Sequence, residues 1–420
     1  MKRIAFINCT QIVTCSGFTA KKGREMSNIG LIENGFILVH DELIHQVGSM
    51  DNIDLSSVDE YEKIDCSGKT VMPGFVDSHT HFVFGGYRAD EYNWRLSGDS
   101  YMSIMEKGGG IINSVRGTKE TSFDDLLKVS KKRLDSMVTF GVTTVEGKSG
   151  YGLEKEVEFK QLEVMKKLNE THSLDIVTTF MGAHTVPTEY KGRGHEFIDL
   201  IIKDMLDYVR ENDLAEFCDI FCEKNVFSVE ESRTLFKAAK EKGFKLKIHA
   251  DEIVQLGGAE LAAEVCATSA DHLLQASDEG ILAMRDAGVV ATLLPCTAFS
   301  LKEEFARGRF MIDSGAPVAL ATDFNPGSCF TESIPLVIAL ATLQMNMTIE
   351  ETITALTING AAAVDRAKTV GSIDAGKKAD IVIHEFPSYK FLPYHIAVST
   401  VEKVFKGGRL IYDREDIKIL

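Results

Sequence analysis

The chain has 420 residues, of which 44% are hydrophobic and 26% are charged, and its formal net charge at pH 7 is −16. This length and composition are typical of a globular protein with one large domain and a smaller one. The negative charge disfavours nucleic acid or an anionic membrane as a partner. No signal-peptide pattern opens the chain, and its eight cysteines are scattered, so we expect a cytoplasmic protein with reduced thiols.

Both ends of the chain have β-strand character. The first 70 residues contain three short β-like runs, at 4–7, 35–39 and 43–47, with turn residues between them. Further β-like runs occur at 379–385 and 401–413. Two flanks of similar character predict a small β-sandwich domain built from both termini, comprising residues 1–70 plus 366–420.

Residues 71–365 alternate short apolar runs with longer segments of helical periodicity. Eight strands alternating with helices are the pattern of a (β/α)8 barrel, so we predict an α/β fold with a TIM-like barrel over this range. The predicted strands are 72–78, 142–146, 175–181, 219–222, 245–248, 267–271, 289–294 and 318–321.

Two of the helical segments illustrate the pattern. In segment 122–140, Ser122 and Asp125 have the spacing of a capping box, and Gly141 follows the last helical position. Segment 334–347 is strongly apolar but is interrupted by Pro335. It is therefore predicted to be a buried helix and not a membrane span.

The first predicted barrel strand ends in two histidines, His79 and His81. Residues i and i+2 of a strand face the same side, so both imidazoles can point to one position. Neutral imidazoles in this arrangement suit a divalent transition metal such as zinc or iron. A His-x-His pair alone is weak evidence, because histidine pairs also occur on protein surfaces.

Further polar residues follow the other predicted strands. In a barrel, the chemistry lies at the carboxyl ends of the strands. Five of the eleven histidines fall there, where chance would also place them in helices and loops. The polar residues at these ends are His79, His81, Lys148, Tyr151, His184, Glu223, Lys224, His249, Glu252, His272, Asp323 and Asn325.

Three imidazoles and a carboxylate, from His79, His81, His249 and Asp323, form a plausible metal site with one position open for water. A bound divalent ion lowers the pKa of such a water, and Asp323 can accept its proton and return it to a leaving nitrogen. Glu252 and His272 are the other candidates for proton transfer.

Each of these residues also has a purely structural interpretation. His184 or His272 alone would more often be a hydrogen-bonded core residue, and Glu252 could simply stabilise a helix N-terminus. Arg88 follows the His-x-His strand closely enough to bind a substrate carboxylate through a bidentate pair, although a surface salt bridge is its default interpretation.

The motifs that carry these residues resemble a known superfamily. Pro73-Gly-Phe-Val-Asp77-Ser-His79-Thr-His81 resembles the opening metal motif of the amidohydrolase superfamily. The motifs with which this superfamily usually leads back to its small β domain are similar to Thr357-Ile-Asn359-Gly-Ala, Gly371-Ser-Ile and Gly376-Lys-Lys-Ala-Asp380-Ile-Val.

Finer motifs resemble one family within it, the imidazolonepropionases, across nearly the whole chain. They are Phe84-Gly-Gly-Tyr-Arg88-Ala-Asp-Glu91, Glu146-Gly-Lys-Ser-Gly-Tyr151-Gly-Leu, Phe180-Met-Gly-Ala-His184-Thr-Val-Pro, His249-Ala-Asp-Glu252, Ser269-Ala-Asp-His272-Leu and Ala321-Thr-Asp323-Phe-Asn325-Pro-Gly327-Ser328.

This resemblance implies a function. The family hydrolyses 4-imidazolone-5-propanoate to N-formimino-L-glutamate, the third step of histidine degradation, with one zinc or iron ion. It implies a homodimer and a small-molecule substrate. By matching position, the metal ligands are His79, His81, His249 and Asp323, and the substrate contacts are Arg88, Tyr151, His184, Glu252, Asn325, Gly327 and Ser328.

Two alternatives stay open. One is another amidohydrolase, such as a cyclic amide hydrolase or a heterocycle deaminase. Some superfamily members hold two metals through a carboxylated lysine on the fourth strand, where Lys224 lies. The other is a non-catalytic scaffold, which is disfavoured because the chain retains every expected ligand. The choice between zinc and iron, the division of proton transfers, and any role of Cys296 or Cys329 also stay open.

Overall fold

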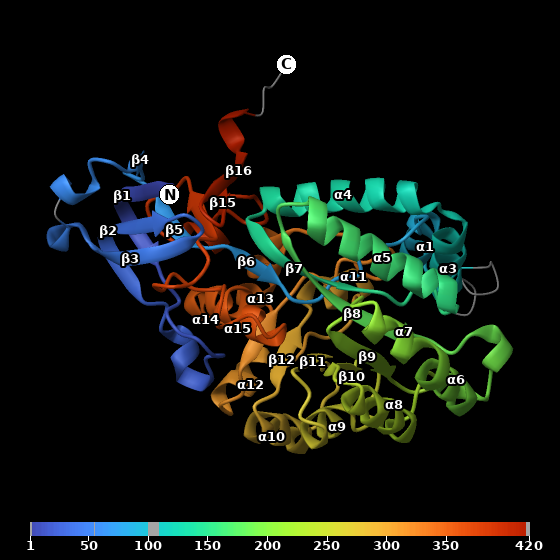
Figure 1. Ribbon diagram of the computed structural model, residues 1–420. Coiled ribbons are helices and arrows are strands. Elements are labelled where there is room, and N and C mark those ends of the chain that lie inside the picture. The colour runs from blue at the N-terminus through green and yellow to red at the C-terminus, as the bar shows by residue number, and fades with distance from the viewer. Residues whose placement is uncertain (1, 54, 100–108, 417–420) are drawn as a thin grey trace.

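The computed structural model describes residues 2–53, 55–99 and 109–416, and the strands in these ranges belong to two separate sheets (Figure 1). One sheet consists of eight parallel strands arranged in chain order. Each predicted run overlaps one of them, so the predicted (β/α)8 barrel is confirmed. The barrel strands are β6 (Phe75–Asp77), β7 (Val142–Lys148), β8 (Asp175–Ala183), β9 (Phe217–Cys222), β10 (Lys245–Ala250), β11 (Ser269–His272), β12 (Val290–Leu293) and β13 (Val318–Leu320).

Helices follow the barrel strands and surround them (Figure 1). They are α1 (Ala89–Leu96), α3 (Ile111–Glu120), α4 (Phe123–Thr139), α5 (Lys155–Thr171), α6 (Gly194–Leu200), α7 (Leu206–Glu211), α8 (Val229–Glu241), α9 (Gly258–Glu264), α10 (Asp278–Ala287), α11 (Pro295–Leu301), α12 (Gly308–Asp313), α13 (Ile334–Leu343), α14 (Ile349–Leu356), α15 (Ile358–Ala363) and α16 (Phe391–Tyr394). A π-helical turn, Ile201–Met205, joins α6 to α7, and short 3-10 turns lie at Gly23–Ser27, Met50–Asn52, Leu55–Val58, Thr188–Tyr190 and Arg414–Asp416.

The predicted helix at 122–140 is α4. The Ser122 hydroxyl accepts a hydrogen bond from the backbone N–H of Asp125, which satisfies one of the free donors of the first turn. Leu134 on its inner face is fully buried. Within the apolar segment at 334–347, residues 334–343 form α13, whose side chains are mostly buried, and the helix ends before Gln344. Among the described residues, no helix has both the length and the apolar character needed to cross a membrane.

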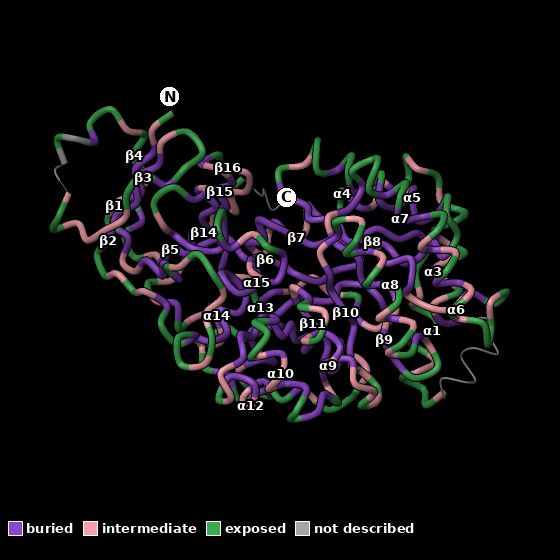
Figure 2. Tube along the Cα trace, turned by 60° about the horizontal axis from the view of Figure 1, so that its bottom comes forward, coloured by how far each residue is buried: buried purple, intermediate pink, exposed green. Residues whose placement is uncertain are grey.

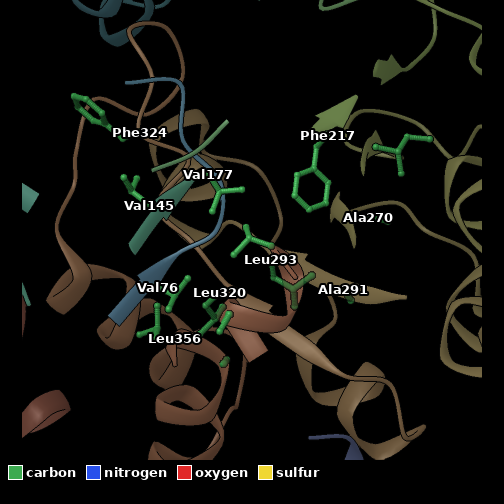
Figure 3. Packing of buried hydrophobic residues seen from close by; sticks show 14 of the residues in the cluster. Val76, Val145, Val177, Phe217, Ala270, Ala291, Leu293, Leu320, Phe324 and Leu356 are labelled. Atoms are coloured by element: carbon green, nitrogen blue, oxygen red, sulfur yellow. The ribbon is translucent and has the colours of Figure 1, made fainter. Parts of the chain in front are cut away.

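The two faces of the barrel strands carry different side chains. Successive residues of a strand point to opposite sides, so alternate positions face the helices and the barrel interior. Val76, Val145 and Val177 on three successive strands belong to the large apolar cluster that also includes Leu356 of α14 (Figure 3). The tube in Figure 2 shows the strands as buried and the outer loops as exposed. The alternate positions facing inward carry charged groups, which are described below.

The barrel closes between its first and last strands through the segments that carry the predicted metal ligands. His81 donates its backbone N–H to the carbonyl of Phe324, at 2.9 Å, and Asp323 donates its own to the carbonyl of His79, at 3.0 Å. Thr322 binds the buried Asp77 carboxylate with its backbone N–H and its hydroxyl. Closure therefore places His79, His81 and Asp323 side by side.

The second sheet is built from both ends of the chain, as predicted, and Figure 1 shows the blue N-terminal strands beside the red C-terminal ones. Phe6 and Phe405 lie on strands separated by two others, yet their ring centroids are only 4.9 Å apart. Neighbouring strands of a flat sheet lie about 4.8 Å apart, so these two strands, three spacings apart, could not bring their rings so close. The short distance between the rings indicates that the sheet curls over its own core like a sandwich. Its strands are β1 (Arg3–Val13), β2 (Leu31–His40), β3 (Leu43–Ser49), β4 (Glu62–Asp65), β5 (Thr70–Pro73), β14 (Ile381–His384), β15 (Val401–Lys406) and β16 (Arg409–Asp413).

Gly74 marks the passage between the two sheets. The predicted strand at 72–78 is split here, because β5 pairs with β14 and β1 of the small sheet, whereas β6 starts the barrel at Phe75. A Cβ atom at Gly74 would lie 2.2 Å from Oγ1 of Thr143. Only glycine allows the chain to pass this close to β7, and the chain enters the barrel after Pro73.

Candidate active site

A cavity of about 630 Å³ opens at the carboxyl ends of the barrel strands. All of the predicted site residues except His79, which lies beneath it, line this cavity. Apolar side chains such as Phe221 and Leu301 complete its wall. The size and mixed lining suit a small polar molecule.

Three of the predicted metal ligands present their imidazoles to one point. The ring centroids of His79 and His249 are 4.6 Å apart, and His81 lies 5.5 and 5.6 Å from them. Among the described residues, His79 belongs to three groups whose ligand atoms all lie within 4.8 Å of one another. One contains His81 and Asp323, a second contains His249 and His272, and the third contains Glu146 and Asp271. The first two bring the four predicted ligands to one place, and add His272.

The hydrogen bonds of these histidines leave one nitrogen of each ring free. Nδ1 of His79 donates to Asp271 at 2.6 Å, Nδ1 of His249 to Asp219 at 3.1 Å, and Nδ1 of His81 to the carbonyl of Ser149 at 3.3 Å. Because Nδ1 carries the proton in each case, Nε2 retains its lone pair. Nε2 of His79 is fully buried, has no hydrogen-bond partner among the described residues, and lies 3.6 Å from Asp323.

The donor set fits a divalent transition metal. Burial, as the main cause, holds the pKa values of His79, His81 and His249 well below the usual range. All three rings are therefore neutral, and metal-binding imidazoles must be neutral. Burial also raises the pKa of Asp323 to about 7, and its Oδ2 accepts a 2.6 Å hydrogen bond from Thr297. A cation at this point would satisfy the orphaned Nε2 and favour the charged form of Asp323.

A buried network of charges lies below these ligands. The Lys148 ammonium lies 2.7 Å from Asp219, 3.0 Å from Glu146 and 3.3 Å from Asp271, and all four side chains are inaccessible to solvent. Burial alone would lower the pKa of Lys148, but the three carboxylates raise it. Lys148 therefore stays charged. A second buried ammonium, that of Lys247, lies 2.7 Å from Glu146. Lys148 thus connects the two aspartates that orient His79 and His249.

Glu252 and His272 form a further pair of titratable groups beside the histidine cluster, and the His272 ring centroid lies 5.1 Å from that of His249. Their carboxylate oxygen and Nδ1 are 3.6 Å apart, and Nδ1 of His272 has no hydrogen-bond partner among the described residues. Burial, then the nearby charges of Asp323 and Glu223, raise the pKa of Glu252 to about 8. Burial lowers the pKa of His272 to about 4. Both groups are thus uncharged near neutral pH in the absence of a metal.

The remaining predicted residues form the walls. Tyr151 and His184 stand beside His81, with ring centroids 5.7 and 5.0 Å from it. Asn325 folds the following loop: its side-chain oxygen accepts the backbone N–H groups of Gly327 and Ser328, and its amide donates to the carbonyl of Asp323. The Arg88 guanidinium lies against Gly327 of the same loop.

Sequence reasoning proposed the metal ligands but gave no role to the residues that hydrogen-bond the predicted site residues. Asp219, Asp271, Thr297 and Glu91 were given no role, although each binds a predicted site residue. A charged residue inside an apolar strand was the available signal for Asp219 and Asp271. The predicted rim residue Lys224 is exposed at the cavity edge. Cys296 and Cys329 are buried, and all eight cysteines are free thiols.

Comparison with known proteins shows which family this chain resembles. The sequence profile of the amidohydrolase family matches residues 70–411. An imidazolonepropionase of Clostridium tetani is 63% identical over 409 residues, covering 97% of each chain. One of Parabacteroides distasonis is 55% identical, covering 97% of this chain and 98% of its own.

Solved structures with the same fold are more distant in sequence. A triazine hydrolase from Arthobacter aurescens superposes with a TM-score of 0.74 at 16% identity, over 99% of this chain and 96% of that one. An E. coli guanine deaminase gives a TM-score of 0.71 at 14% identity, over 99% of this chain and 100% of that one. At such identities the likeness concerns the fold alone.

Proposed function

The chain belongs to the amidohydrolase family and, within it, to the imidazolonepropionases, and from this premise we propose that it hydrolyses the ring amide C–N bond of 4-imidazolone-5-propanoate. The product is N-formimino-L-glutamate, and the reaction is the third step of histidine degradation. The observation that supports this assignment best is that one neutral histidine cluster and the Arg88 guanidinium line a single cavity. A small cyclic amide that bears a carboxylate needs both.

His79, His81, His249 and Asp323 would hold one zinc or iron ion. When bound, that ion supplies Lewis acidity, which makes a water molecule more acidic and polarises the ring carbonyl. The fixed Nδ1 hydrogen bonds of His79 and His249 keep their lone pairs aimed at the ion position, so the ligands need no rearrangement.

Asp323 is the residue placed to move a proton. Its Oδ2 is held by Thr297, while its Oδ1 faces the histidine cluster. It can take a proton from the attacking water and deliver it to the ring nitrogen as the C–N bond breaks. Glu252 and His272 form a second proton-holding pair beside the histidine cluster, where they can bind the ring N–H groups or assist in deprotonation.

Arg88 and Tyr151 orient the substrate from the cavity wall, and His184, Asn325, Gly327 and Ser328 complete its contacts. The Arg88 guanidinium is the cation that offsets the overall charge of −16 for an anionic substrate. Its planar fork can bind the propionate through two parallel hydrogen bonds.

Metal removal tests the assignment directly. Turnover of freshly prepared 4-imidazolone-5-propanoate, followed as N-formimino-L-glutamate above the spontaneous rate, is expected to disappear when a chelator strips the protein. One equivalent of zinc or iron per chain should restore it, because the site offers one set of four ligands. Undiminished turnover by protein shown to be metal-free would contradict the proposal. A requirement for two equivalents would favour the two-metal amidohydrolase alternative.

Substitution of Arg88 by Gln tests the carboxylate contact. We expect KM to rise at least about 30-fold with kcat changed only a few-fold, because a charged hydrogen-bonded pair is lost while the reacting ring is untouched. Steady-state kinetics provide the measurement, and Arg24→Gln, at an exposed position in the 3-10 turn Gly23–Ser27, serves as the matched control. An unchanged KM would show that the propionate binds elsewhere.

We also propose a homodimer in the cytoplasm, as the family resemblance implies. Exposed apolar side chains such as Leu343 and Tyr394, at the ends of α13 and α16, support an interface. Sedimentation velocity should then give about twice the chain mass of 46.3 kDa, and a monomer at micromolar concentration would exclude it.

A further inference from the structure

The side chain of Glu91 is buried on the wall of the cavity, although no chemistry has been assigned to it. Glu91 lies in the first turn of α1, three residues after Arg88, and only 6% of its surface is exposed. Its Oε2 accepts the Nε–H of Arg88 at 2.8 Å and the backbone N–H of Gly110 at 2.9 Å. Its Oε1 accepts the side-chain amide of Asn113 at 2.9 Å.

These contacts bring three hydrogen-bond donors to the Glu91 carboxylate. Burial by itself would raise its pKa, but the hydrogen bonds from Asn113 and Gly110 and the charge of Arg88 lower it, so the carboxylate is ionised. Gly110 and Asn113 belong to the start of α3. Glu91 therefore ties the Nε edge of the guanidinium to a second helix and fixes the plane of the group.

Gly327 limits the guanidinium from the opposite side. A Cβ atom at Gly327 would lie 2.0 Å from Nη1 of Arg88 and 2.9 Å from its central carbon. The backbone of Gly327 is itself held by Asn325, two residues after Asp323. Arg88 thus lies between a carboxylate on α1 and a loop that continues from Asp323, with its Nη groups at the cavity.

We propose that Glu91 is the positioning residue that sets Arg88 for substrate carboxylates, and that Gly327 contributes by having no side chain. The inference rests on the proposed function, because it deepens the role given there to Arg88. Glu91 contacts no substrate in this scheme. It aligns the fork so that both Nη groups meet one carboxylate, and by doing so it makes the site selective for an imidazolone with an anionic side chain.

Glu91→Gln is the matched test, since Gln keeps the size of the side chain but replaces one acceptor oxygen by an NH2 group that faces N–H donors. We expect KM for the propionate substrate to rise about 10-fold with kcat within about 3-fold, as for loss of an orienting contact. For the analogue with a propionamide side chain, kcat/KM should be unchanged. Thermal unfolding and metal content of Glu91→Gln should match those of the parent protein. The control variant Asp90→Asn, at the exposed position just before Glu91, should leave the kinetic constants for both substrates unchanged.

A double-mutant cycle separates positioning from a general structural role. If Glu91 acts through Arg88, Glu91→Gln should have no further effect in the Arg88→Gln background. An undiminished effect in that background, or an equal loss for both substrates, would overturn the inference. Failure of the proposed function would look different, because the parent protein would then show no turnover or no sensitivity to Arg88→Gln.

Gly327→Ala provides an independent variant, since the backbone at Gly327 is not in the left-handed region. The added methyl group must displace the guanidinium, so the ratio of kcat/KM for propionate over propionamide should fall about 10-fold, as for Glu91→Gln. An equal loss for both substrates would refute the steric role of Gly327.

Discussion

Replacement of Asp323 by Asn is expected to lower kcat by about three orders of magnitude or more, because one substitution removes both a proposed metal ligand and the proposed proton carrier. Asn has the same shape as Asp, so the 3.0 Å backbone bond to His79 that helps to close the barrel should survive. The Asn amide cannot accept a proton from water at neutral pH. The measurements are single-turnover kinetics and metal content.

Thr297→Val is the graded control for this experiment. It removes the 2.6 Å hydrogen bond to Oδ2 but leaves the carboxylate in place. We expect kcat to fall about 10-fold, as is typical when one orienting hydrogen bond next to the reacting atoms is lost. If Asp323→Asn retained near-normal turnover with metal bound, the proposed mechanism would be wrong. Full metal content with no turnover would assign the loss to proton transfer, whereas an empty site would assign it to metal binding.

Lys148→Met is expected to reduce the free energy of unfolding by about 3–5 kcal/mol, the usual effect of removing one partner from a buried ion pair. The variant leaves Asp219, Asp271 and Glu146 in the barrel interior with Lys247 as the remaining buried cation that contacts Glu146. Three buried carboxylates then share one ammonium, that of Lys247, which lies 2.7 Å from Glu146 and 3.7 Å from Asp271. Urea denaturation of metal-free protein measures the effect.

The matched control is Lys128→Met on the exposed face of α4, which should change the unfolding free energy by less than about 0.5 kcal/mol. Metal affinity provides a second reading, since Lys148 holds the aspartates that orient His79 and His249. We expect metal-loaded Lys148→Met to release its ion to a competing chelator sooner than the parent protein. Parent-like stability of Lys148→Met would show that the network contributes little.

The strands of the barrel could be predicted, and metal ligands could be proposed at their carboxyl ends, because both inferences depend on local patterns. Apolar runs of four to eight residues separated by amphipathic segments specify the order β6 to β13 without reference to any contact. The i, i+2 spacing of His79 and His81 follows from strand geometry. The one local error, the run at 72–78, arose because β5 and β6 are both apolar and only the close packing of Gly74 against Thr143 separates them.

By itself, the sequence determined the fold class, the metal ligands proposed at the strand ends and the family. Only the tertiary structure decided which charges meet. Asp271 reaches His79 across 192 residues, and Lys148 reaches Asp219 across 71. His272 and Asp323 adopt left-handed backbone angles, with φ of 75° and 52°, that turn their side chains away from strand periodicity. The physical reason is that the curvature of the closed barrel and these local turns set side-chain directions, and no pattern along the chain encodes either.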